Sequence, residues 1–243
     1  MSSGASLVYT TYLGGFDTTV VSYQDVISGI AADAAGNAYV SGNASYDFPV
    51  TGGANNTTPC PSANSCGNRG FLAKINPAGS ALVWATFVGT GTSNPAISSA
   101  STISSPRLDA GGNVYVSGIA GNNTEYPLVN PLQPANGFGG VYVTMYDPTG
   151  STIYFSTVIY DPKANGGVFN SGVDVDSQGN IYVAGYTSQP DLPATAGSFR
   201  TAITGNYDGF IAKITAPATP PTRKIVGGVA ADIRVAGRVG CNP

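Results

Sequence analysis

The most informative segment of the chain is Gly172-Val-Asp-Val-Asp176-Ser-Gln-Gly179-Asn180-Ile-Tyr182-Val183-Ala-Gly185. Its central pattern, Asp-x-x-Gly-Asn-x-Tyr-Val-x-Gly, occurs twice more, at residues 33–42 and 109–118. The three copies are spaced by about 70 residues, and a pattern that recurs at such a spacing indicates an array of equal structural units. The repeat therefore predicts the architecture before any single residue does.

The Asp-x-x-Gly-Asn part of the pattern predicts a turn between two strands. An Asp side chain can accept hydrogen bonds from backbone N–H groups two residues on, and Gly and Asn tolerate a positive φ. We expect a structural role for these residues, since an enzyme would more often break the symmetry at one site. The predicted turn residues are Asp33, Gly36, Asn37, Asp109, Gly112, Asn113, Asp176, Gly179 and Asn180.

Two further segments recur in each repeat and are rich in β-branched and aromatic residues, which predicts strands. The first comprises residues 7–14, 82–89 and 153–159, and the second comprises residues 71–75, 142–146 and 210–214. No stretch has the apolar period of a helix. Four short antiparallel strands per repeat form a sheet that must bury both faces, so sheets stacked radially as propeller blades are expected. The predicted fold is all-β, a β-propeller-like array of three four-stranded blades.

These segments also resemble a known repeat family. The strand pattern, an acidic-x-Pro step at 47–49, 125–127 and 191–193, and Phe-x-Ala-Lys at 71–74 and 210–213 are similar to the bacterial SBBP repeat, named for a seven-bladed β-propeller. The resemblance spans about residues 5–216 and is weakest at Pro106-Arg-Leu-Asp; a fainter similarity is to NHL-type repeats. It implies a propeller architecture and an exported or cell-surface bacterial protein, without catalytic residues tied to the repeat.

The predicted domains are three blade-like repeats at 1–79, 80–150 and 151–216, followed by a Pro-rich linker and strand tail at 217–243. Propellers typically have four to eight blades, so three repeats are not expected to close a ring. Two chains can combine into a six-bladed ring, open faces can stack head to tail into a fibre, or the chain is part of something longer. The tail is expected to pair with the sheet of the next subunit.

Composition limits the partners. Only 9% of the residues are charged, the net charge is −3, and no cluster of Lys and Arg is dense enough to follow phosphates, so nucleic acid is not expected as a partner. No apolar run approaches the length of a membrane span. The N-terminal residues lack the pattern of a secretion signal, although the predicted location is extracellular or at the cell surface.

The chain has three cysteines. Cys60 and Cys66 bracket a short loop segment, which favours a local disulfide and an oxidising compartment, with two unpaired thiols as the alternative. Cys241 is expected to be a free thiol or to form an intermolecular link.

The chain contains no histidine, which excludes Ser-His-Asp and Cys-His nucleophiles and His-ligated zinc. No enzyme, metal or cofactor is expected. Calcium at Asp174 and Asp176, two residues apart beside a Gly-rich turn, is the remaining alternative, but the chain has no Asp-x-Asp-x-Asp-Gly loop. Two functions remain open: a structural protein that self-assembles through open blades and its tail into a polymer or filament, or a homodimeric module that binds glycans or proteins through the long loops at 43–69, 119–139 and 186–207.

Overall fold

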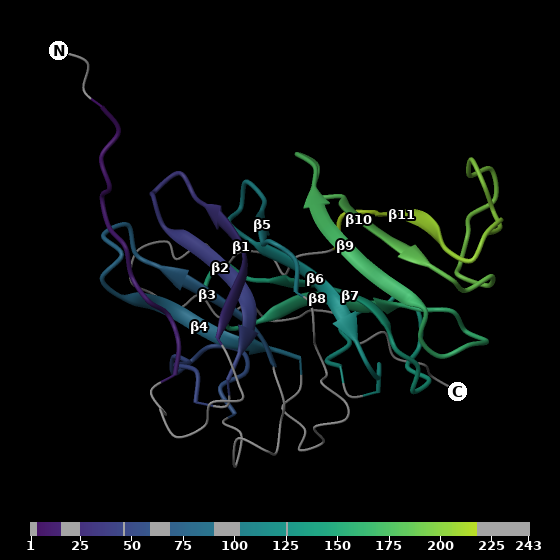
Figure 1. Cartoon of the computed structure of the whole chain (residues 1–243), viewed down its shortest axis with the longest axis horizontal. Helices are drawn as coiled ribbons and strands as arrows, with labels where there is room; N and C mark the ends of the chain where they lie inside the picture. The colour runs from purple at the N-terminus through teal and green to yellow at the C-terminus, as the bar shows by residue number, and fades with distance from the viewer. Residues whose placement is uncertain are drawn as a thin grey trace, which may run out of the picture.

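The computed structural model describes residues 4–15, 25–45, 47–58, 69–89, 103–124 and 126–217. These residues form three antiparallel sheets and contain no helix, so the predicted all-β class is confirmed. The sheets follow one another in chain order as an open array of blades (Figure 1).

The strands of each sheet are consecutive in the chain. The first sheet contains β1 (Val26–Ala32), β2 (Ala38–Ala44), β3 (Arg69–Ile75) and β4 (Leu82–Val88). The second contains β5 (Arg107–Leu108), β6 (Val114–Ala120), β7 (Gly140–Tyr146) and β8 (Ile153–Ile159). The third contains β9 (Val168–Val175), β10 (Ile181–Thr187) and β11 (Asp208–Ile214).

The three sheets share one register, so their positions can be compared directly. Tyr39 pairs with Lys74 in the first sheet, and Tyr182 pairs with Lys213 in the third. At the same position of the second sheet, Tyr115 pairs with Met145. Each recurring Tyr thus lies at one site of a repeated hairpin.

Two details of the described sheets differ from the predicted blades. Residues 7–14 do not form a strand, and the described part of the third sheet has three strands instead of four. The other two copies of the first segment are β4 and β8, the last strands of their sheets. A turn at 76–79 connects β3 to β4, a turn at 147–150 connects β7 to β8, and each last strand pairs with the strand before it. Each sheet is therefore offset by one strand from the sequence repeat.

The first strand of the second sheet, β5, has only two residues. Pro106 precedes it directly, and proline has no backbone N–H to donate to a strand ladder. This is the point where the second repeat departs from the other two in sequence.

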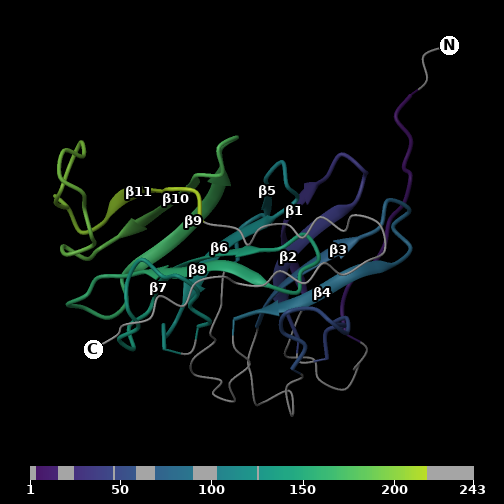
Figure 2. The same cartoon turned by 180° about the vertical axis from the view of Figure 1, so that it is seen from behind.

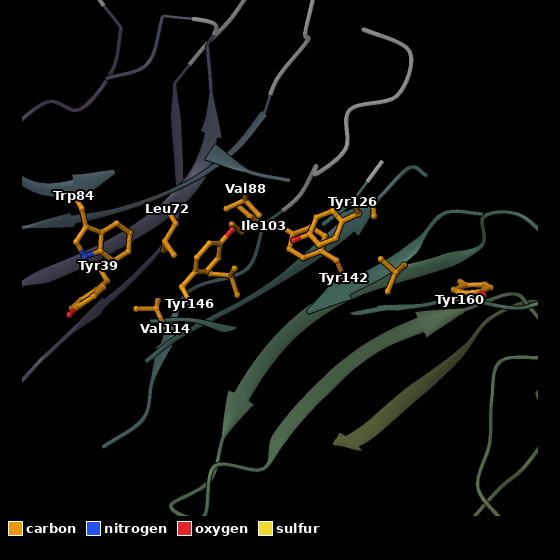
Figure 3. Close-up of a cluster of buried hydrophobic side chains, with 13 residues drawn as sticks. Tyr39, Leu72, Trp84, Val88, Ile103, Val114, Tyr126, Tyr142, Tyr146 and Tyr160 are labelled. Atoms are coloured by element: carbon orange, nitrogen blue, oxygen red, sulfur yellow. The ribbon is translucent and has the colours of Figure 1, made fainter. Parts of the chain in front are cut away.

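Neighbouring sheets bury their facing side chains. The cluster between the first two sheets includes Tyr39, Leu72 and Trp84 from the first and Tyr142 and Tyr146 from the second (Figure 3). A second cluster joins the second and third sheets, and a third lies on the outer face of the first sheet. Seen from behind, the three sheets keep this order (Figure 2). Burial of both faces stabilises the middle sheet.

Several predictions lie outside the described residues. They concern the disulfide between Cys60 and Cys66, the role of Cys241, and the strand tail, of which only Pro217 belongs to the described part.

Candidate functional site

The three predicted Asp turns have one geometry. The Oδ1 atom of Asp33 accepts hydrogen bonds from the N–H groups of Ala35 and Asn37 at 3.0 and 2.9 Å. Its Oδ2 atom accepts from the Asn37 Nδ2 and the Tyr39 hydroxyl at 2.8 and 3.2 Å. The same backbone and side-chain bonds recur around Asp109 and Asp176. Each carboxylate thereby closes its turn and ties it to the recurring Tyr.

The glycine of each turn has the backbone conformation that the pattern predicts. Gly36, Gly112 and Gly179 have φ values of 82°, 80° and 82°. Residues with a Cβ atom rarely adopt such values. The Gly at this position therefore allows the Asp carbonyl to accept the N–H of the Gly itself, at 2.9 to 3.0 Å.

Hydrogen bonding makes two of these carboxylates unusually acidic. Partial burial raises the pKa of Asp33, but bonds from Asn37 and the charge of Lys74, 3.5 Å away, outweigh it and lower the pKa from 3.8 to about 2. The bond from the Asn180 side chain is the main cause that lowers the pKa of Asp176 to about 2. Both groups stay ionised at neutral pH, which suits hydrogen-bond acceptors in turns.

The pair Asp174 and Asp176 does not converge on a cation site. Asp174 lies 3.3 Å from the Arg107 guanidinium of the second sheet, whereas Asp176 is engaged in its turn. No group of three or more His, Cys, Asp or Glu suited to a metal occurs among the residues that the structure describes. Within the same residues, no helix has the length and apolar character needed to cross a membrane.

The third sheet is more exposed than the second sheet. In its last strand, β11, only Ile214 is buried and the six residues before it alternate between half-buried and exposed, whereas every residue of β7 is buried. Ile211 is 82% exposed, but its counterparts Leu72 and Val143 are 0% exposed. Among the described residues, nothing therefore covers one edge and one face of the third sheet.

A groove runs along this edge. It has a volume of about 690 Å³ and is lined by β11 and by the loop residues 192–195 and 198–203. Phe199, on that loop, is 99% exposed. Near one end of the open face, Phe169 stacks on Tyr186 with ring centroids 4.7 Å apart, and Tyr207 packs against both rings. Exposed apolar surface of this kind marks interaction sites.

Residues 8–49 and 164–192 match the family model SBBP, described as a beta-propeller repeat. In these two segments the chain is similar to SBBP repeats. The two matched segments include β1 with β2 and β9 with β10, that is, the first and third Asp turns. Curated proteins give no match to the chain.

The predicted turn residues come together only within each of the three repeats, and the three sets do not converge on one site. The open edge was not predicted, because the third repeat has the same strand pattern as the other two. The available signal was the segment 7–14, which matches β4 and β8 in sequence but has no equivalent after β11 within the described residues.

Proposed function

We propose that the protein is a non-enzymatic structural subunit that self-assembles through the open side of its blade array. The observation that carries this proposal is the contrast between Ile211, which is exposed, and its buried counterparts Leu72 and Val143. An uncovered strand edge offers unpaired N–H and C=O groups to another chain. Sheets of this kind are stable when both faces are covered, so a further sheet on the third blade extends the same packing.

The proposed location is the exterior or surface of a bacterial cell. The SBBP repeats and the low content of charged residues support this location. The segment 217–243 is proposed to take part in pairing between subunits, with head-to-tail growth into a filament as the favoured outcome.

Catalysis is not part of the proposal. The recurring carboxylates of Asp33 and Asp176 are engaged by backbone and Asn donors, and their pKa of about 2 is unsuited to proton transfer near neutral pH. The chain also lacks histidine.

A second candidate function is favoured by the aromatic cluster of Phe169, Tyr186 and Tyr207. Aromatic faces that remain accessible on a rigid sheet can stack against sugar rings or bury a protein partner. In this alternative, two chains close as a homodimer, and the loops of each present a glycan- or protein-binding surface.

Size-exclusion chromatography with light scattering, followed by negative-stain microscopy, tests the proposal. We expect masses at multiples of 24.5 kDa that increase with protein concentration, and polymers in the images. Discrete dimers together with glycan binding would favour the second function. A stable monomer at micromolar concentration would contradict self-assembly.

A further inference from the structure

The segment 7–14 has the residue pattern of a last blade strand. Its Tyr9, Thr11 and Leu13 match Trp84, Thr86 and Val88 of β4. The matching residues of β8 are Phe155, Thr157 and Ile159. β4 and β8 are the strands that complete the first and second sheets.

This segment also lies against the first sheet as β4 lies against the second. The Trp84 ring covers Gly150, at the turn between β7 and β8, and Tyr9 covers Gly79 at the equivalent turn between β3 and β4. Both glycines have a positive φ, of 68° and 67°. Leu13 packs on the outer cluster of the first sheet, just as Val88 belongs to the cluster that faces the second sheet.

The segment nevertheless lacks a partner strand among the described residues. Tyr12 is 100% exposed, whereas its counterpart Phe87 is 1% exposed and pairs with Phe71. Leu7 and Val8 are exposed as well. Residues 7–14 are therefore placed like a last strand with respect to the following sheet, without belonging to a sheet themselves.

In the first two sheets, the last strand lies between the third strand and a loop. On its outer side, β4 bonds to the loop through Thr51 N–H to Ala85 C=O at 3.1 Å and Phe87 N–H to Asn56 C=O at 3.0 Å. β8 is bridged to Val129 in the same way, with N···O distances of 2.9 and 3.0 Å. In the third sheet, the equivalent space is the open groove between β11 and loop residues 192–203.

The segment 7–14 and strand β11 of one chain lie at opposite ends of the array in both views (Figures 1 and 2). We propose that residues 7–14 of a second copy form the fourth strand of the third sheet, antiparallel to β11. The register of β3 with β4 places Tyr9 opposite Lys213, Thr10 opposite Ala212 and Tyr12 opposite Phe210. The first sheet of the second copy then stacks on the third sheet of the first copy and covers Ile211.

This inference rests on the proposed self-assembly and names the strand that performs it. In β4, the N–H groups of Ala85 and Phe87 point to the loop, so the N–H group of Thr86, between them, points to β3. Thr11 is the counterpart of Thr86, and its N–H group is expected to point to β11. Thr11→Pro removes that donor and is expected to reduce self-association at least tenfold. Val8→Ser is the matched control, since the equivalent Val83 is 49% exposed in a completed sheet.

A cross-link tests the register directly. Cys60, Cys66 and Cys241 are replaced by Ser, and Thr10→Cys is made in one preparation and Ala212→Cys in another. Thr10 and Ala212 correspond to Ala85 and Ala73, which form a non-hydrogen-bonded pair of the kind that brings Cβ atoms close together. Mild oxidation of the mixture is expected to give a covalent dimer. Ile211→Cys mixed with Thr10→Cys is the control, because residue 211 faces the other side of the sheet.

The outcomes separate the two proposals. A covalent dimer from the first mixture only, with loss of association in Thr11→Pro, supports the donated strand. If Thr11→Pro associates as the unmodified protein does and the mixture gives no cross-link, the proposal that residues 7–14 complete the third sheet is overturned, while self-assembly stands. The groove would then be assigned to another segment, such as the tail. A chain carrying both cysteines that cross-links internally would overturn the second copy as the source. An unmodified protein that stays monomeric would overturn self-assembly itself.

Discussion

The second and third sheets show what the same strand does with and without a neighbour. β7 and β11 follow the same hairpin in the same register. β7 pairs with β8 and packs against sheets on both faces, whereas in the described part of the chain β11 has one edge and one face without a neighbour. Val143 and Ile211, at one position of the repeat, are 0% and 82% exposed. The sequence repeat therefore determines where a strand forms, whereas the burial of its side chains depends on the sheets that stack against it.

The largest loss of stability is expected when Trp84, at the contact between the first and second sheets, is replaced. Trp84 is buried, and its indole Nε1 donates to the Pro148 carbonyl at 3.2 Å. Trp84→Ala is expected to lower the free energy of unfolding by about 4 kcal/mol, through lost burial and the cavity left behind. Chemical unfolding monitored by circular dichroism measures this loss. Tryptophan fluorescence does not serve here, because Trp84 is the single Trp of the chain.

Tyr9→Ala is the matched variant for this test. Tyr9 covers Gly79 but is 36% exposed, so its removal is expected to cost less than about 1 kcal/mol at concentrations where the protein is monomeric. An equal loss of unfolding free energy in both variants would mean that residues 7–14 stabilise the monomer as much as β4, a strand within a complete sheet, does.

A smaller effect is expected at the position that defines the comparison. Val143→Ala removes two methyl groups from a packed interior and is expected to destabilise the monomer by about 2 kcal/mol. Ile211→Ala is expected to change its stability by less than about 0.5 kcal/mol and to weaken self-association instead. Thermal unfolding and analytical ultracentrifugation of both variants measure these effects. Similar destabilisation by both would mean that Ile211 is already buried in the monomer.

The Asp turns predict a dependence on pH in the first and third sheets. Asp33 has a pKa of about 2 in the folded protein and an ordinary value of 3.8. The folded state is thus favoured above pH 3.8, and this contribution is lost as the pH falls toward 2. Asp33→Asn is expected to cost about 1 kcal/mol at pH 7 and to flatten the fall in stability between pH 4 and pH 2.

Unfolding of Asp33→Asn and the unmodified protein across this pH range measures the effect, with Asp174→Asn as the control. Asp174 is an exposed carboxylate whose partner is Arg107 rather than a turn. Parallel pH profiles for all three proteins would contradict the turn as the source of the effect.

The smallest effect is expected on the loop beside the groove. Phe199 is 99% exposed, so Phe199→Ser is expected to leave the free energy of unfolding of the monomer within about 0.5 kcal/mol of its original value. Thermal unfolding in dilute solution measures this. A marked loss of stability would mean that the ring already packs within one chain.

Sequence patterns predict the hairpins well, because each Asp-x-x-Gly-Asn turn is closed by its own residues. The carboxylate of Asp33 and the positive φ of Gly36 need no distant partner. The aromatic and β-branched alternation likewise predicts β4 and β8. Local chemistry therefore accounts for most of the all-β fold.

The candidate site could not be predicted in this way, since it depends on which neighbour is present. Residues 7–14 have the composition of a strand but lie outside any sheet, because backbone pairing requires a partner that local sequence does not specify. For the same reason, the motifs around Phe71 and Phe210 look alike although β3 is covered and β11 is open.

Hydrogen exchange measured as a function of protein concentration shows whether a second copy completes the third sheet. If the third sheet is completed by a second copy, the amides of β11 and of residues 7–14 gain protection together as concentration rises, while those of β7 are protected throughout. Protection of β11 equal to that of β7 in the most dilute samples would contradict completion of the third sheet by a second copy. Assembly that leaves β11 and residues 7–14 unprotected would contradict it as well.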